Sequence, residues 1–138
     1  MKIKRSDALQ LFNGLHALER NADNKPYDFT FETWDKIFQI LSCIAPVVDA
    51  YTNARKQKFI KASDGKAIIE DPDANLTFQM EDSATLEAII SVKLPKVLLT
   101  EDELRLSANK IPPSIRVQLK PVVPWKTAAE LDEDENDY

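Results

Sequence analysis

The chain has 138 residues, of which 43% are hydrophobic and 30% charged, a composition typical of one folded domain and not of a disordered chain. The formal net charge is −5, and the last eleven residues hold six acids and no base, so residues 1–127 carry about +1. This balance matches neither the basic surface of a typical nucleic-acid-binding protein nor the acidic surface of a DNA mimic.

Two amphipathic helices are predicted in the first half of the chain. Apolar residues recur every three or four positions over residues 7–20, and Ser6 in front of them is suited to cap a helix. A longer apolar seam covers residues 31–61, with Thr30 as its expected cap. Pro46 lies inside this second helix and removes one main-chain hydrogen bond, which predicts a kink or a break there.

Short strands are predicted after the long helix. Gly65 is suited to the C-terminal cap of that helix, and residues 66–70 and 76–80 have the composition of two strands. The DPDAN segment between them is suited to a hairpin loop. Alternating apolar residues over 90–94 indicate a third strand.

Short helical segments are expected beside these strands. Residues 83–88 are suited to one helical turn, and Thr100 begins a capping-box signature before a short helix over 101–107. Residues 111–120 fit a helical turn and a strand equally well. The prediction is therefore an α+β fold, in which two N-terminal helices, the second long and kinked near Pro46, precede a small antiparallel sheet with short helical insertions.

The residue types that carry catalysis or bind metals do not cluster in the sequence. His16 is the only histidine and Cys43 the only cysteine, and both are expected on helices in structural roles. The spacing of Asp71, Asp73 and Asn75 matches the start of a calcium loop, but Leu76 occupies the position that needs glycine. We therefore expect no enzyme, no cofactor, and no catalytic or metal-binding residue. An exposed cleft containing His16 and two carboxylates would revive the enzyme alternative.

The second half of the long helix is basic. Its cations are Arg55, Lys56, Lys58 and Lys61. Positive charge near a helix C-terminus complements the helix dipole, which is the interpretation we favour. Contact with phosphate or nucleic acid is the alternative, and we do not expect nucleic acid as the main partner.

The C-terminal segment offers the best candidates for partner binding. Trp125 either packs the chain end against the domain or anchors a partner. The chain is predicted to form one domain over residues 1–125 and an acidic tail over 126–138. The tail residues predicted to contact a basic surface of another protein are Glu130, Asp132, Glu133, Asp134, Glu135, Asp137 and Tyr138.

Two alternatives remain for this tail. It is either a solvated chain end or, by its similarity to the tails of phage single-stranded-DNA-binding proteins, a part of such a protein. The second alternative requires a barrel that begins with strands, whereas this chain begins with helices.

Four segments in order carry a resemblance to a known group of proteins. They are MKIKRSDAL at the start, YTNARKQKFIK at the end of the long helix, LTFQMEDSATLEAIISVKL, and IPPSIRVQL. Over about residues 1–120 the chain resembles a loose group of uncharacterised small proteins of tailed-bacteriophage genomes, and it departs from them at Pro46 and in the acidic tail. Such proteins are in many cases encoded near virion structural genes, so the resemblance implies an assembly or accessory role, and it implies no catalytic residues.

These observations lead to one principal hypothesis and two alternatives. We expect a non-enzymatic, phage-encoded protein-interaction module with a structural, assembly or accessory role in the virion. The alternatives are an anti-defence inhibitor that binds a host protein through its acidic tail, and a nucleic-acid-binding accessory protein. The expected partner is a virion component or a host protein, with a second copy of the chain as a further candidate.

The expected location is the virion or the cytoplasm of the infected bacterial cell. The single cysteine excludes an intrachain disulfide, which fits a reducing compartment. No apolar run approaches the roughly 20 residues that span a bilayer, and the first 15 residues lack the apolar segment of a signal peptide. We therefore expect a soluble protein that is not secreted and has no transmembrane segment.

Overall fold

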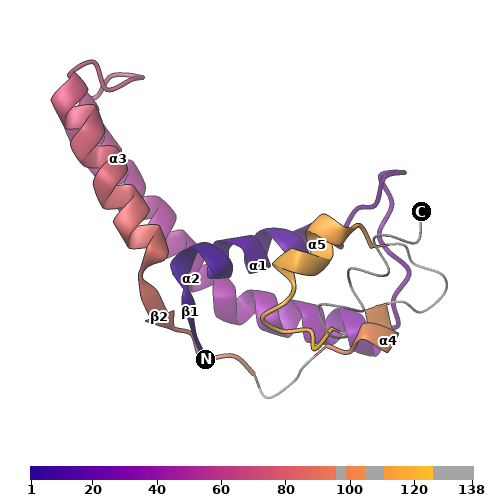
Figure 1. The fold of residues 1–138 in the computed structure, drawn as a ribbon. Coiled ribbons are helices and arrows are strands. Elements are labelled where there is room, and N and C mark those ends of the chain that lie inside the picture. The colour runs from indigo at the N-terminus through magenta and orange to yellow at the C-terminus, as the bar shows by residue number, and fades with distance from the viewer. Residues whose placement is uncertain (96–98, 105–110, 126–138) are drawn as a thin grey trace.

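The computed structural model describes residues 1–95, 99–104 and 111–125. This part of the chain is mostly helical and contains one small antiparallel sheet, which agrees with the α+β class in this coarse sense (Figure 1). In chain order the elements are β1 (Lys2–Lys4), α1 (Arg5–Ala17), α2 (Phe31–Ser63), α3 (Pro72–Glu87), β2 (Ile89–Ser91), α4 (Glu101–Leu104) and α5 (Pro113–Gln118).

The hydrophobic core lies where α1, the first half of α2 and α5 meet (Figure 1). Leu11 and Leu15 of α1 are fully buried, as is Leu18 directly after the helix. Burial of one such side chain stabilises a fold by about 1.5–3 kcal/mol. The residues that complete the core are Ile37, Ile40, Ile44, Leu99, Leu104, Leu119, Val122 and Val123.

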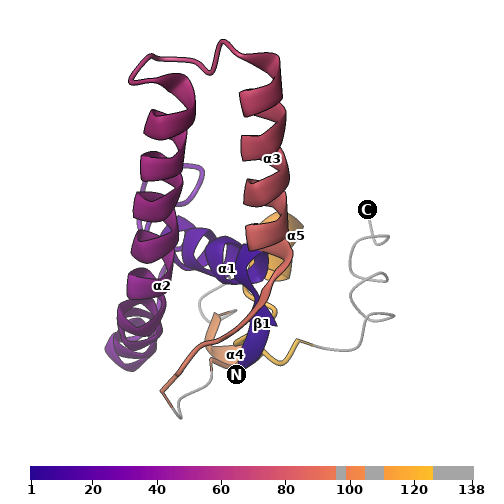
Figure 2. The ribbon, with the colours of Figure 1, turned by 90° about the vertical axis from the view of Figure 1, so that its left-hand side faces the viewer.

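The second half of α2 extends away from this core and forms a helical hairpin with α3. Figures 1 and 2 show the two helices side by side and antiparallel. Phe59 of α2 contacts Phe78 of α3 edge to face, with ring centroids 5.7 Å apart. Phe78 is the only buried residue of α3. Helix α3 therefore contributes little to the buried interior.

The ends of α2 follow the predicted capping chemistry. The Thr33 amide donates a hydrogen bond of 3.2 Å to the Thr30 hydroxyl, which confirms the predicted N-cap. At the other end Asp64 and Gly65 both have positive φ angles, 54° and 77°. The Gly65 amide donates to the carbonyl of Ile60, so the helix ends where the glycine predicts it.

Two predictions about helix boundaries need correction. The first helix begins at Arg5, directly after β1, and its N-terminus has no side-chain cap, so the predicted role of Ser6 is wrong. The second helix runs without interruption through Pro46, so the chain does not break there. The kink expected at Pro46 stays a prediction.

The predicted strand pair over residues 66–70 and 76–80 is wrong. Residues 76–80 belong to α3, and no strand forms over 66–70. The DPDAN segment begins this helix instead of forming a hairpin loop. Asp71 caps it by accepting a hydrogen bond of 3.2 Å from the Asp73 amide, and Pro72 occupies the first turn, where its missing N–H costs nothing. The helical turn expected over 83–88 is the last part of the same helix.

The sheet pairs the start of the chain with its middle. Strands β1 and β2 are antiparallel, with Ile3 opposite Ile90. The strand predicted over residues 90–94 is thus found in part, one residue earlier and shorter, and its partner was not predicted. The sheet holds the N-terminus of α1 against the end of α3.

Two helices are found in the last third of the chain, one where the sequence left helix and strand open and one where it predicted a helix. Residues 111–120, which fit helix and strand equally, contain α5 over Pro113–Gln118. The helix predicted over 101–107 is found as α4, and residues 105–107 lie outside the described part of the chain. Thr100 caps α4 as predicted, because its hydroxyl accepts a hydrogen bond of 3.2 Å from the Glu103 amide.

Candidate functional site

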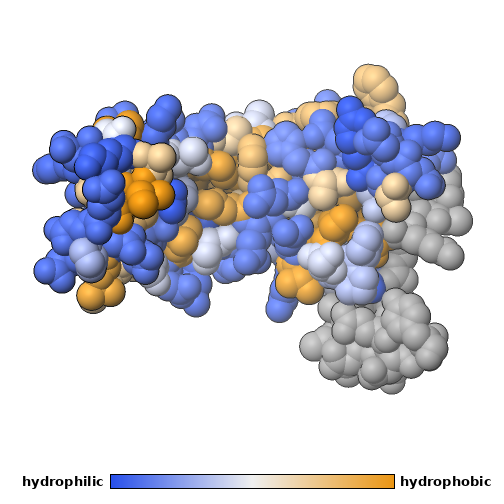
Figure 3. All heavy atoms as spheres, turned by 90° about the horizontal axis from the view of Figure 1, so that it is seen from above, coloured by the Kyte–Doolittle hydropathy of each residue, from blue (hydrophilic) through white to orange (hydrophobic). Residues whose placement is uncertain are grey.

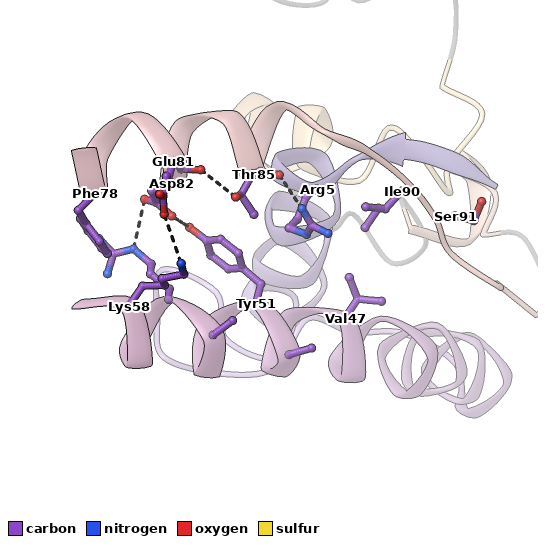
Figure 4. Close-up of a pocket in the computed structure, with 13 residues that line it drawn as sticks. Arg5, Val47, Tyr51, Lys58, Phe78, Glu81, Asp82, Thr85, Ile90 and Ser91 are labelled. Atoms are coloured by element: carbon purple, nitrogen blue, oxygen red, sulfur yellow. Dashed lines mark hydrogen bonds and ion pairs between the residues drawn. The ribbon is translucent and has the colours of Figure 1, made fainter. Parts of the chain in front are cut away.

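An open cleft of about 450 Å³ lies between the second half of α2, α3 and β2 (Figure 4). Small side chains on α2, Ala50 and Ala54, leave room between the two helices. Val47 and Ile90 line one end of the cleft, and polar side chains of α3 lie toward the other end. The cleft therefore combines an apolar end with a charged end.

Asp82 connects the two walls of the cleft. The hydroxyl of Tyr51 on α2 donates a hydrogen bond to one carboxylate oxygen of Asp82. Nε of Arg55, also on α2, donates to the other oxygen over 3.2 Å. Burial raises the pKa of Tyr51 to about 12, and the hydrogen bond to Asp82 acts in the same direction. Tyr51 is therefore a neutral hydrogen-bond donor at physiological pH.

The basic face predicted on the second half of α2 is partly neutralised by α3. Arg55 binds Asp82 and stacks on the ring of Phe78, with its guanidinium carbon 5.1 Å from the ring centroid. Lys58 forms an ion pair with Glu81 over 3.6 Å. Two of the four cations proposed for phosphate contact thus have acidic partners within the hairpin, which weakens the nucleic-acid alternative.

A third cation, Arg5, enters the cleft from the first turn of α1. Its Nη1 donates a hydrogen bond of 2.7 Å to the main-chain carbonyl of Thr85, near the end of α3 (Figure 4). The Arg5 amide also donates to the Ala88 carbonyl over 3.0 Å. Each bond joins residues about 80 positions apart in the sequence, and together they hold α1 against the end of α3.

Trp125 packs against the domain. Its indole Nε1 donates a hydrogen bond of 2.8 Å to the main-chain carbonyl of Arg116, and its ring is partly buried against the core. This geometry favours the packing role over the partner-anchoring role for Trp125. The other predicted partner-binding residues, Glu130 to Tyr138, lie outside the described part of the chain.

His16 lies in an open depression that Trp34 and Phe38 of α2 also line. Its Nδ1 contacts the carboxylate of Glu19 over 2.6 Å. Among the described residues that line this depression, Glu19 is the one carboxylate, whereas the enzyme alternative required two. Cys43 is partly buried on α2.

The residues of the calcium-like string do not converge. Asp71 caps the N-terminus of α3. Asp82, which falls at the twelfth position of a calcium loop counted from Asp71, lies three turns further along the same helix and binds Tyr51 and Arg55. Over residues 1–95, 99–104 and 111–125, no three histidine, cysteine, aspartate or glutamate side chains are grouped as metal ligands would be. In the same residues, no helix has the length and apolar character to cross a bilayer.

Comparisons with protein-family models, curated proteins and solved structures find no match to this chain. The hairpin, its cleft and the sequence resemblance are therefore the features of this chain that bear on its function.

The sequence does not predict the cleft, because the alternation of apolar and polar residues over 76–80 predicts a strand. A usable signal was present in Asp71 followed by Pro72, the residue types preferred at the N-cap and first position of a helix. Reading a helix from there would have placed Phe78, Asp82 and Thr85 close to one face, since they are spaced by three and four residues.

Proposed function

We propose that this chain is a non-enzymatic protein-interaction module whose contact surface is the outer face of the α2–α3 hairpin. The observation that carries the proposal is the exposure of large apolar side chains there. Leu76 and Met80 of α3 are 57% and 65% exposed, and their spacing of four residues places them on one side of the helix. Ile68 in the turn that precedes α3 is 65% exposed.

The position of these side chains supports the proposal more than their number does. Single apolar residues are common on protein surfaces. These three belong to an arm that extends from the core and contributes one buried residue from α3 (Figures 1 and 2). Seen from above, the hairpin end at the left of Figure 3 carries apolar side chains set among polar ones. Exposed apolar side chains that are rimmed by polar residues mark candidate sites of protein contact.

For the biological setting we propose a phage-encoded protein with a structural, assembly or accessory role in the virion, and a virion component as the partner. The support is the sequence resemblance to small proteins of tailed bacteriophages. A second copy of the chain is a further candidate partner. If the chain stays monomeric by light scattering across micromolar concentrations, self-association is excluded.

A capture experiment tests the hairpin surface. The wild-type chain and the double variant Leu76→Glu/Met80→Glu would serve as baits in extract of infected cells. Two buried charges in an apolar contact are strongly unfavourable, so the double variant should lose the partner. Thr77→Glu, an exposed substitution on a neighbouring side of α3, is the matched control and should retain it. Equal capture by all three baits would contradict the proposal.

The acidic tail supports a second candidate function, an anti-defence inhibitor that occupies a basic groove of a host protein. The observation behind it is the run of six acids in residues 128–138. A bait truncated after Ala129 should then lose the partner, and capture by the full chain should weaken steeply as salt is raised. Retention by the truncated bait would exclude the tail as the binding element.

We also propose that Pro46 kinks α2, so that its first half follows the core and its second half follows α3. Proline has no N–H, so the carbonyl of Ser42 lacks its usual helical partner. Pro46→Ala should change the angle between core and hairpin, measured by residual dipolar couplings. Unchanged couplings in the two halves of α2 would show that packing alone sets the direction of the hairpin.

A further inference from the structure

We propose that the cleft between α2, α3 and β2 binds a small amphiphile, an apolar chain that ends in a single carboxylate, with Arg5 holding the carboxylate. This goes beyond the proposed protein contact, which lies on the opposite face of α3. The cleft volume of about 450 Å³ is within the roughly 300–1,000 Å³ found for small-molecule sites.

The apolar end of the cleft is suited to the hydrocarbon part of the ligand. Val47 of α2 and Ile90 of β2 line this end. Ala50 also lines the cleft, and its small side chain takes up little of the space. Figure 4 shows Arg5 next to this end, between Ile90 and Tyr51. A chain lying along Val47 and Ile90 would therefore place its head group at Arg5.

The charges in the cleft leave Arg5 without an acidic partner. Both carboxylates of the lining are already bound, Glu81 by Lys58 and Asp82 by Arg55 and Tyr51. The Arg5 side chain donates one hydrogen bond, to the neutral carbonyl of Thr85. Over residues 1–95, 99–104 and 111–125, no ion pair joins Arg5 to a carboxylate.

This charge balance selects one class of ligand. Arginine stays protonated at any physiological pH, and its planar donors match a carboxylate. Among the residues that the structure describes, the lining has three cations and two carboxylates, so one negative charge on the ligand neutralises it. A neutral amphiphile would leave Arg5 uncompensated, and a cationic one would be repelled by it.

The test is a titration of the full chain with three probes of equal chain length: decanoate, decanol and decylamine, each below its micelle concentration. Calorimetry should show one decanoate per chain, and decanol and decylamine should bind more weakly. Amide shifts on adding decanoate should centre on Val47, Tyr51 and Ile90. The readout requires no protein partner, so failure here is separate from failure of the capture experiment.

Variants identify the head-group contact. Arg5→Gln should weaken decanoate binding by about tenfold to a hundredfold and leave decanol binding unchanged, since a charge-assisted hydrogen bond is lost. Arg5→Lys keeps the charge and should retain part of the affinity. Arg20→Gln, which removes an exposed arginine outside the cleft, is the matched control and should bind decanoate as the wild type does.

A second kind of variant tests the cleft independently of Arg5. Ala50→Trp places a large ring in the cleft from an exposed position, so the fold should persist while decanoate binding is lost. This variant decides the question if Arg5→Gln does not fold. The proposal is overturned if decanoate does not bind, if decylamine binds as tightly, or if neither Arg5→Gln nor Ala50→Trp weakens decanoate binding.

Discussion

At the scale of single residues, Asp82 is the group that joins the two helices of the hairpin. It is partly buried on α3 and accepts hydrogen bonds from Tyr51 and Arg55, both on α2. Two hydrogen-bond donors compensate this partly buried carboxylate for the water it has lost. Removing one donor leaves part of that desolvation uncompensated and destabilises the fold. The protonated Tyr51 hydroxyl therefore helps to hold α2 and α3 together.

The raised pKa of Tyr51 predicts a loss of stability in alkali. Its pKa in the folded protein is about 12, above the ordinary 10, so its contribution is complete below pH 10 and is lost as pH rises toward 12. The free energy of unfolding should fall more steeply over this range in the wild type than in Tyr51→Phe. Urea unfolding at several pH values measures both. Identical pH dependence in the two proteins would contradict the assignment.

The lowered pKa of Glu103 predicts a loss of stability in acid. Burial pushes its pKa up, but hydrogen bonds from Lys36, Thr100 and Thr33 outweigh this effect, so its pKa is lowered from 4.5. Its contribution is therefore present above pH 4.5 and is lost as pH falls through the lowered value. Glu103→Gln should be less stable than the wild type at neutral pH, and the difference should shrink in acid. A difference that is independent of pH would refute this role.

At the scale of elements, the packing of α1 against α5 depends on Gly14. A Cβ atom at this position would lie 2.8 Å from Cβ of Gln118 and 3.3 Å from Cδ2 of Leu119. Cβ of Gln118 is close to the main chain and cannot move away by a change of rotamer. The absence of a side chain at residue 14 therefore sets how closely the two helices approach.

The substitution Gly14→Ala has two opposing effects on the free energy of unfolding. Alanine favours a helix over glycine by about 1 kcal/mol, whereas overpacking of a close contact costs about 1–3 kcal/mol. We expect the steric term to win and the free energy of unfolding to decrease. Asn13→Ala, on an exposed position of the same helix, should raise it by a few tenths of a kcal/mol. Thermal and urea unfolding of the two variants give the comparison, and a stabilised Gly14→Ala would show that α5 shifts freely.

At the scale of the whole molecule, the chain consists of a packed core and a hairpin that extends from it. The fully buried apolar residues of α1 and α2 lie in the core, and none lies in α2 beyond Ile44. The hairpin is held by Phe59 and Phe78, by the Asp82 contacts and by the bonds of Arg5. Because few of the hairpin's contacts are buried, opening the hairpin costs less free energy than opening the core.

Hydrogen exchange should resolve these two parts. Amides of α3 are expected to exchange faster than those of α1 around Leu11 and Leu15, because their opening exposes little apolar surface. Exchange followed by mass spectrometry measures this directly. Decanoate bound in the cleft should slow exchange in α3 and leave the amides around Leu11 and Leu15 of α1 unchanged. Equal protection of α1 and α3 in the free protein would show that the hairpin and the core open as one unit.

The sequence by itself determined the two helices of the first half, the second of them long. Apolar side chains spaced by three and four residues must bury one face, and Leu11, Leu15, Ile37 and Ile44 do so in the core. The Thr30 cap was likewise predictable, because a helix N-terminus needs acceptors within a few residues of sequence. Local chemistry decides such features, and local chemistry is visible in the sequence.

Tertiary contacts decided features that the local pattern did not show. Leu76, Phe78 and Met80 alternate with polar residues as in a strand, yet they lie in a helix, where Phe78 packs against Phe59 of α2. The pairing of β1 with β2, and the bond from Arg5 to Thr85, join residues that lie 80 or more positions apart. The cleft exists because these distant contacts place α2, α3 and β2 side by side, and no pattern confined to neighbouring residues encodes such an arrangement.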